Sequence, residues 1–134
     1  MSEDCSRIVS FRDRVALVTG AAGNIGLATC RRLSAMGVKI AAADVDAAAV
    51  ESRMSGLRTG GAEIRAYAMD VTDRRGVFDA VARVMSDFGR IDILVNNAGV
   101  WEHRDVVGRQ RFEEMDPVEW RRLMKIDVDG VFNC

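Results

Sequence analysis

Short runs of apolar and small residues alternate with segments of helical spacing along this chain. The runs lie at residues 15–18, 38–43, 62–69 and 91–95, and each is followed by a polar residue. A strand of a parallel sheet is covered on both faces, so it reads as a largely apolar run rather than as a strict alternation. The four runs therefore predict buried parallel strands.

Helical spacing fills the intervals between these runs. Apolar and small residues recur every third or fourth position over 25–36, and an alanine-rich helix is expected over 46–57. A third, amphipathic helix is expected between a Thr72 cap and a closing Gly89. Strands alternating with helices predict the α/β class, with a parallel sheet of about four strands.

The last helical pattern follows a polar stretch and continues to the final residue. We expect Asp116 as its N-cap, Pro117 as its first helical residue and Glu119 as a reciprocal cap. Apolar positions then recur with helical period as far as Phe132, without a closing glycine or polar cap. We therefore expect residues 1–134 to form one domain that is truncated, the N-terminal portion of a longer protein.

Composition and charge fit an ordinary globular protein and argue against several classes. The chain is 49% hydrophobic and 29% charged, with one proline and 12 glycines, which argues against disorder and collagen-like repeats. No apolar run approaches the roughly 18 residues that span a bilayer. The balance of 19 basic and 20 acidic residues gives no attraction to nucleic acid or to anionic membranes.

The cysteines point to a reducing compartment. Cys5, Cys30 and Cys134 are odd in number, far apart in sequence and without metal-ligand spacing. We expect three reduced thiols, no metal site and a cytoplasmic protein.

The first run opens into segment 19–26 (TGAAGNIG), which leads into a helix. Glycines in such a turn permit a tight bend and let backbone N–H groups approach a pyrophosphate, which the helix N-terminus also attracts. A glycine-rich turn alone is a weak signal, because any strand-to-helix turn can use glycine. Whether this turn indicates a nucleotide site depends on the residues at the ends of the other three apolar runs.

Each of those ends carries polar side chains. Asp44 follows the second run, Asp70 the third, and an Asn-Asn-Ala-Gly turn at 96–99 the fourth. An open α/β sheet binds its ligand at the carboxyl ends of its strands, so these residues are expected to share one site. The Asp44 carboxylate can accept hydrogen bonds from ribose hydroxyls and would repel a 2′-phosphate. Since Val45 offers no basic replacement, we expect NAD in preference to NADP.

These motifs, in this order, resemble the short-chain dehydrogenase/reductase family from about residue 11 to the end of the chain. The resemblance implies a Rossmann-like doubly wound parallel sheet with the strand order 3-2-1-4. Segment 23–29 (GNIGLAT) is similar to the xylitol-type polyol dehydrogenases within it. The resemblance implies cofactor-binding roles for a set of residues at the strand ends. They are Gly20, Asn24, Ile25 and Gly26 at the pyrophosphate, Asp44 with Val45 at the adenosine ribose, Asp70 and Val71 at the adenine, and Asn96, Asn97, Ala98 and Gly99 at the inner part of the cofactor.

The chain departs from the family pattern at two positions. Asn24 stands where the family has its middle glycine, and asparagine tolerates left-handed backbone better than most residues. The family's catalytic asparagine falls on Asp127, which we expect on the buried face of the last helix. Burial without a cation would raise the pKa of that carboxyl, although a lysine farther along a longer protein could pair with it.

The family's Tyr-x-x-x-Lys pair is absent from this sequence. Tyr67 is the only tyrosine, and neither Lys39 nor Lys125 follows it by four positions. Reduction of a carbonyl needs a proton donor near the developing alkoxide, with its pKa lowered by a neighbouring cation. We therefore expect this chain alone to be inactive.

Residues after the Asn-Asn-Ala-Gly turn offer alternatives for the chemistry. His103 is a conceivable substitute acid, and Trp101 and Glu102 could line a substrate entrance, but an exposed surface loop accounts for all three.

The leading hypothesis is the NAD(H)-binding part of an oxidoreductase that interconverts an alcohol and a ketone by hydride transfer. The resemblance implies a homo-oligomer when the protein is complete, acting on a small molecule. A naturally short, non-catalytic nucleotide-binding or dimerising module is the alternative. A Rossmann-like methyltransferase is a weaker one, because the Thr-Gly opening and the Asn-Asn-Ala-Gly turn argue against it.

Overall fold

The computed structural model describes residues 10–100 and 111–134. Four strands form one parallel sheet in the order β3-β2-β1-β4, namely β1 (Val15–Thr19), β2 (Lys39–Asp44), β3 (Ile64–Ala68) and β4 (Ile93–Val95). The helices are α1 (Asn24–Ala35), α2 (Ala47–Thr59), α3 (Arg74–Phe88), α4 (Pro117–Met124) and α5 (Gly130–Asn133), with a 3₁₀ turn η2 (Phe112–Glu114) before α4 and a π-helical turn η3 (Lys125–Asp129) after it. The predicted α/β class and strand order are confirmed, and β3 and β4 are shorter than predicted.

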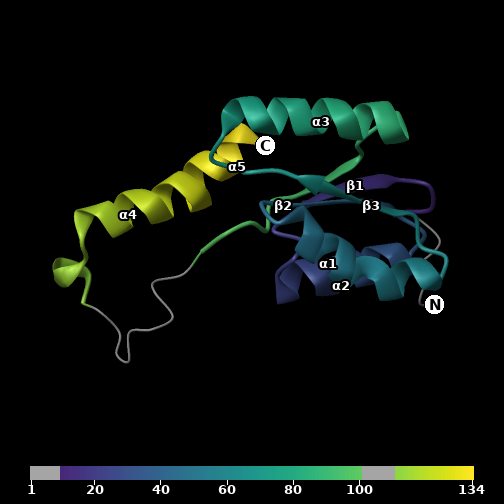
Figure 1. Cartoon of the computed structure of the whole chain (residues 1–134), viewed down its shortest axis with the longest axis horizontal. Coiled ribbons are helices and arrows are strands. Elements are labelled where there is room, and N and C mark those ends of the chain that lie inside the picture. The colour runs from purple at the N-terminus through teal and green to yellow at the C-terminus, as the bar shows by residue number, and fades with distance from the viewer. Residues whose placement is uncertain (1–9, 101–110) are drawn as a thin grey trace, which may run out of the picture.

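Helices cover both faces of the sheet, with α1 and α2 on one side and α3 on the other (Figure 1). All of β1 is buried, and its side chains alternate between the two faces. Ala16 and Val18 pack in a cluster with Met54 of α2, whereas Leu17 packs in a second cluster with Val84 of α3. This burial on both faces explains why the strands read as apolar runs.

The described cysteines are free thiols. Cys30 lies on α1 within the first cluster, where burial raises its pKa to about 11 and keeps the thiol protonated at neutral pH. Cys134 is half-buried and packs against the second cluster. Cys5 lies outside the described residues.

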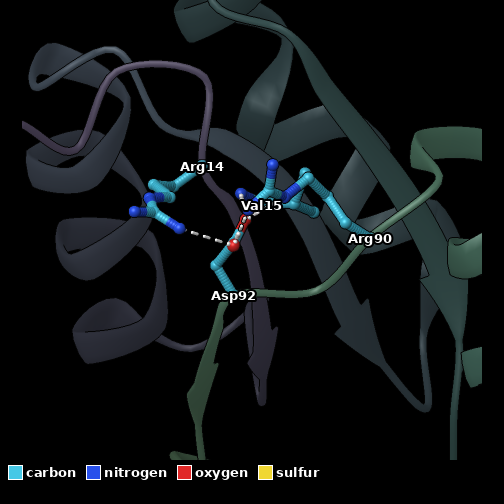
Figure 2. A network of polar contacts seen from close by, with 4 residues as sticks. All are labelled: Arg14, Val15, Arg90 and Asp92. Carbon is cyan, nitrogen blue, oxygen red and sulfur yellow. Dashed lines mark hydrogen bonds and ion pairs between the residues drawn. The ribbon is translucent and has the colours of Figure 1, made fainter.

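A polar network fastens the amino-terminal ends of β1 and β4 (Figure 2). The Asp92 carboxylate accepts the backbone N–H of Val15 at 2.9 Å and the Arg14 guanidinium at 3.0 Å. It also accepts two hydrogen bonds from Arg90, one of them 2.8 Å long. The donors hold the pKa of this carboxyl well below its ordinary value, with Arg90 the largest cause.

The last helical segment begins as the sequence predicts. Asp116 accepts the N–H of Val118 at 2.7 Å, and Pro117 is the first helical residue. The Glu119 carboxylate, predicted as a reciprocal cap, accepts hydrogen bonds of 2.8 and 2.6 Å from Arg122. Helix α4 lies away from the sheet, and the helical segment continues from it to α5, which lies beside α3 (Figure 1).

Several apolar positions of this last segment are exposed. Val128, Val131 and Phe132 expose 50%, 44% and 77% of their surface. The Arg74 guanidinium lies 5.4 Å from the ring centroids of both Phe78 and Phe132, which links α3 to α5. None of the helices formed by residues 10–100 and 111–134 is both long and apolar enough to cross a membrane.

Candidate functional site

Two glycines allow the turn between β1 and α1 to close tightly. Gly20 has φ +63°, and a Cβ atom there would lie 2.8 Å from the Cα of Ala98. A Cβ atom on Gly26 would lie 2.3 Å from the carbonyl oxygen of Gly20 and 2.8 Å from the Cα of Ala21. Neither position can hold a side chain without displacing backbone, so the turn forms a bare backbone cradle.

A second turn, after β4, is fixed to the first by hydrogen bonds. The hydroxyl of Thr19, which is 2% exposed, accepts the N–H groups of Asn97 at 3.1 Å and Ala98 at 3.0 Å. The Asn97 amide group donates to the carbonyl oxygens of Thr19 and Gly20 at 2.9 and 3.1 Å. The Asn97 side chain is thus used for structure, whereas Asn96 is exposed.

Asp44 lies beside the glycine-rich turn. One carboxylate oxygen accepts the backbone N–H of Ala22 at 3.0 Å, and the other accepts that of Asp46 at 3.3 Å. The neighbouring Val45 is 71% exposed. The carboxylate therefore helps to shape the turn at the position where the sequence predicts a contact with ribose.

The end of β3 is organised by Asp70, and here one prediction was wrong. Thr72 does not cap α3, because its hydroxyl and its N–H both donate to the same Asp70 oxygen at 2.8 Å. The N-cap is Asp73, whose carboxylate accepts the N–H of Arg75 at 3.1 Å. Both residues are good cap formers, and the turn that Asp70 fixes places the second of them at the helix start.

Helix α5 packs against Val71, which follows the same strand, β3. The Asn133 amide donates to the Val71 carbonyl oxygen at 2.8 Å. A Cβ atom on Gly130 would lie 2.7 Å from a methyl carbon of Val71, so a glycine is needed for this approach. The sequence patterns did not identify Gly130 or Asn133. A glycine inside an otherwise helical pattern could have indicated a close approach at position 130.

A hollow of about 360 Å³ lies where these strand ends meet. Its lining combines most of the predicted nucleoside-site residues with one residue of the last helical segment: Gly20, Asp44, Val45, Met69, Asp70, Val71, Thr72, Ala98, Gly99, Val100 and Ile126. Asn24 and Ile25 line a separate hollow on α1, and Ile25 is 73% exposed. The structure thus brings Asp44, Asp70 and the 98–99 backbone to one concave surface at the carboxyl end of the sheet.

Asn24 adopts helical rather than left-handed backbone. It is the first residue of α1, and among the described residues other than glycine, Asp13 is the one with positive φ. The side-chain amide oxygen of Asn24 accepts a hydrogen bond of 2.7 Å from Arg53 of α2. Sequence analysis missed Arg53, since no local pattern links two residues so distant along the chain.

Asp127 is exposed, contrary to the prediction that it lies on a buried face. Its carboxylate accepts the N–H of Val100 at 3.0 Å, and its Oδ1 lies 3.2 Å from where a Cβ atom on Gly99 would stand. The prediction assumed an unbroken α-helical period from Leu123. The π-helical turn η3 adds a residue per turn and rotates the faces that follow it.

Two further predictions concern Tyr67 and the residues that follow Val100. Tyr67 lies in β3 as predicted, 4% exposed, and its hydroxyl donates to Asp87 at 2.7 Å. Trp101, Glu102 and His103 lie outside the described residues.

The fold and site together define a Rossmann-type α/β protein with its candidate ligand surface at the carboxyl ends of parallel strands. The model of the short chain dehydrogenase family matches residues 14–134, and the chain belongs to that family. This confirms the resemblance inferred from the strand-end motifs.

Individual relatives agree with the family assignment. The chain is 38% identical over 125 residues to cis-4-hydroxycyclohexanecarboxylate dehydrogenase of Sinomonas cyclohexanicum, covering 93% of this chain and 48% of the relative. It is 38% identical over 119 residues to D-threitol dehydrogenase of Mycolicibacterium smegmatis, covering 89% and 44%. The crystal structure of NAD⁺-bound xylitol dehydrogenase matches with TM-score 0.82 and 39% identity, covering 93% and 46%. The chain spans about half the length of the relatives it matches.

Proposed function

We propose that this chain is the NAD(H)-binding part of an oxidoreductase that interconverts an alcohol and a ketone. The observation that carries the proposal is the hollow of about 360 Å³ at the strand ends, lined by Gly20, Asp44 and Asp70. A backbone cradle that admits no Cβ atom, beside carboxylates able to accept from ribose and adenine, fits a dinucleotide. The bound nicotinamide would supply the hydride chemistry.

Each predicted residue has a role in this proposal. The turn containing Gly20, Asn24, Ile25 and Gly26 would hold the pyrophosphate with backbone N–H groups, and Asp44 beside Val45 would accept from the ribose hydroxyls. One oxygen of Asp70 is engaged by Thr72, which leaves the other to accept from the adenine near Val71. The turn Asn96, Asn97, Ala98 and Gly99 would approach the inner part of the cofactor with its backbone.

The catalytic proposal for Asp127 rests on its position in the family pattern and on its hydrogen bond to Val100. That bond ties η3 to the turn after β4, so Asp127 would position this turn. Without a Tyr-x-x-x-Lys pair the 134-residue chain should hold the cofactor and transfer no hydride to a carbonyl.

We further infer that residues 1–134 are the N-terminal dinucleotide-binding portion of a longer cytoplasmic protein that assembles as a homo-oligomer. The coverage of about half of each relative supports this. The coding frame beyond Cys134 would test it, because a serine and a Tyr-x-x-x-Lys motif are expected there. A frame that ends without them would contradict the inference and favour a short nucleotide-binding module.

Cofactor choice is tested by titrating the chain with NADH and with NADPH. The wild-type chain is expected to favour NADH, and Asp44→Ala to reduce that preference about tenfold by removing the charge that repels a 2′-phosphate. Asp44→Asn is the matched control, because its side-chain oxygen can still accept from Ala22 while the charge is lost. If both variants keep the wild-type ratio, Asp44 does not select the cofactor.

A further inference from the structure

The strand ends around the proposed dinucleotide site carry negative charge. Asp44 ends β2 and Asp46 follows it, Asp70 and Asp73 follow β3, and segments 19–26 and 96–100 contain no basic residue. A dinucleotide adds two phosphate charges to this surface. A helix N-terminus contributes only about half a unit of positive charge, so a cation from elsewhere in the fold would strengthen binding.

Arg53 brings a guanidinium to the glycine-rich turn. It lies on α2, and its Nη2 atom donates to the side-chain oxygen of Asn24 at 2.7 Å. Asn24 is the first residue of α1 and belongs to the glycine-rich turn, only two positions after Ala22, whose N–H donates to Asp44. Both Arg53 and Asn24 are exposed, so an incoming anion can reach the guanidinium.

Three other arginines of α3 and α4 are engaged elsewhere. The Arg74 guanidinium lies against the rings of Phe78 and Phe132. Arg75 pairs with Asp79 at 3.3 Å, and Arg122 pairs with a glutamate of its own helix. Arg53, in contrast, is hydrogen-bonded to the turn itself.

We propose that Arg53 binds a phosphate group of the dinucleotide and that Asn24 is its positioning residue. This rests on the proposed function and deepens it. It also explains the departure from the family pattern, because a glycine at position 24 would offer no acceptor to hold the guanidinium beside the turn. The fork of N–H donors on arginine suits phosphate oxygens, whether they belong to the pyrophosphate or to a 2′-phosphate.

The test is calorimetric titration of the 134-residue chain with NADH and NADPH at low and high salt. Arg53→Gln is expected to weaken NADH binding about tenfold at low salt and to flatten its salt dependence, since one phosphate contact is lost. Arg53→Lys, which keeps the charge, should recover most of the affinity, and Asn24→Gly should fall between the two. Arg31→Gln removes the same charge from an exposed position of α1 away from the turn, and should change binding by less than about twofold.

The NADPH arm identifies which phosphate is bound. An equal loss for both cofactors assigns the contact to the pyrophosphate, and a larger loss for NADPH assigns it to the 2′-phosphate. If Arg53→Gln binds both NADH and NADPH like Arg31→Gln, with unchanged salt dependence for each, the inference about Arg53 is wrong while the proposed function stands. A wild-type chain that binds neither dinucleotide would overturn both.

Discussion

The buried hydroxyl of Thr19 accepts the backbone N–H of Asn97 at 3.1 Å, and the Asn97 side chain returns a hydrogen bond of 2.9 Å to the Thr19 carbonyl oxygen. This reciprocal pair joins the end of β1 to the turn after β4. Both turns of the proposed cofactor site therefore depend on one contact between strands that are distant in sequence. Its loss should loosen the site as well as the fold.

Thr19→Val is expected to destabilise the chain by about 1–3 kcal/mol, the usual consequence of leaving buried N–H groups without an acceptor. Valine has nearly the shape of threonine, so the effect isolates the hydroxyl. Urea denaturation of this variant should be compared with that of Thr19→Ser, which keeps the oxygen and loses only a methyl group. Equal stability of the two variants would show that the hydroxyl does not hold the turns together.

Two glycine-to-alanine substitutions should have opposite effects on stability. Gly26→Ala places a methyl group 2.3 Å from the carbonyl oxygen of Gly20, and should cost about 1–3 kcal/mol while abolishing tight NADH binding. Gly56→Ala lies within α2 with nothing within 4 Å of the added carbon, and should stabilise the chain by about 0.5–1 kcal/mol. Thermal unfolding of both variants distinguishes the two effects, and a shift in the same direction would contradict the proposed close approach at Gly26.

The strands and the glycine-rich turn could be predicted because each depends on local pattern or on backbone sterics, and the strand order followed from the family resemblance. The Arg53–Asn24 and Asn133–Val71 contacts could not, since they join positions brought together only by the packed layers. Asp127 was misplaced for a different reason. Its burial was judged from an α-helical period, and the π-helical turn that contains it changes that period without a clear sequence signal.

Asp92 should make the stability of the chain depend on acidic pH. Arg90, the Val15 N–H and Arg14 lower the folded-state pKa of its carboxyl below the ordinary 3.8. The resulting stabilisation is present above the unfolded pKa near 3.8, and it is lost as the pH falls toward the lower folded value. Asp92→Asn should therefore have a lower Tm than wild type at pH 7, and the difference should shrink below about pH 4.

The control for this pH dependence is Asp79→Asn, which removes a single exposed pairing with Arg75. Its Tm should stay close to that of wild type across the range from pH 7 to pH 2. A constant gap between Asp92→Asn and wild type over the same range would contradict the role assigned to the Asp92 charge.

Tyr67 should make the stability of the folded chain depend on pH in the alkaline range. Burial, and the hydrogen bond that its hydroxyl donates to Asp87, raise the pKa of the phenol above its ordinary value of 10. The folded state therefore keeps its proton after the unfolded tyrosine has lost it, so stabilisation present below pH 10 declines as the pH rises above it. Tyr67→Phe should cost about 0.5–1.5 kcal/mol at neutral pH, the net value of a hydrogen bond, and its stability should converge with that of wild type above pH 10.

The measurement is direct because the chain contains one tyrosine, so tyrosinate absorbance reports this side chain alone. In the folded chain the absorbance should rise only well above pH 10, whereas in denaturant it should rise near the ordinary pKa. Asp87→Asn removes the negative charge facing the hydroxyl and should move the folded transition toward lower pH, because the tyrosinate would no longer lie beside a carboxylate. A folded phenol that ionises near pH 10 would show that the Tyr67–Asp87 contact does not form in solution.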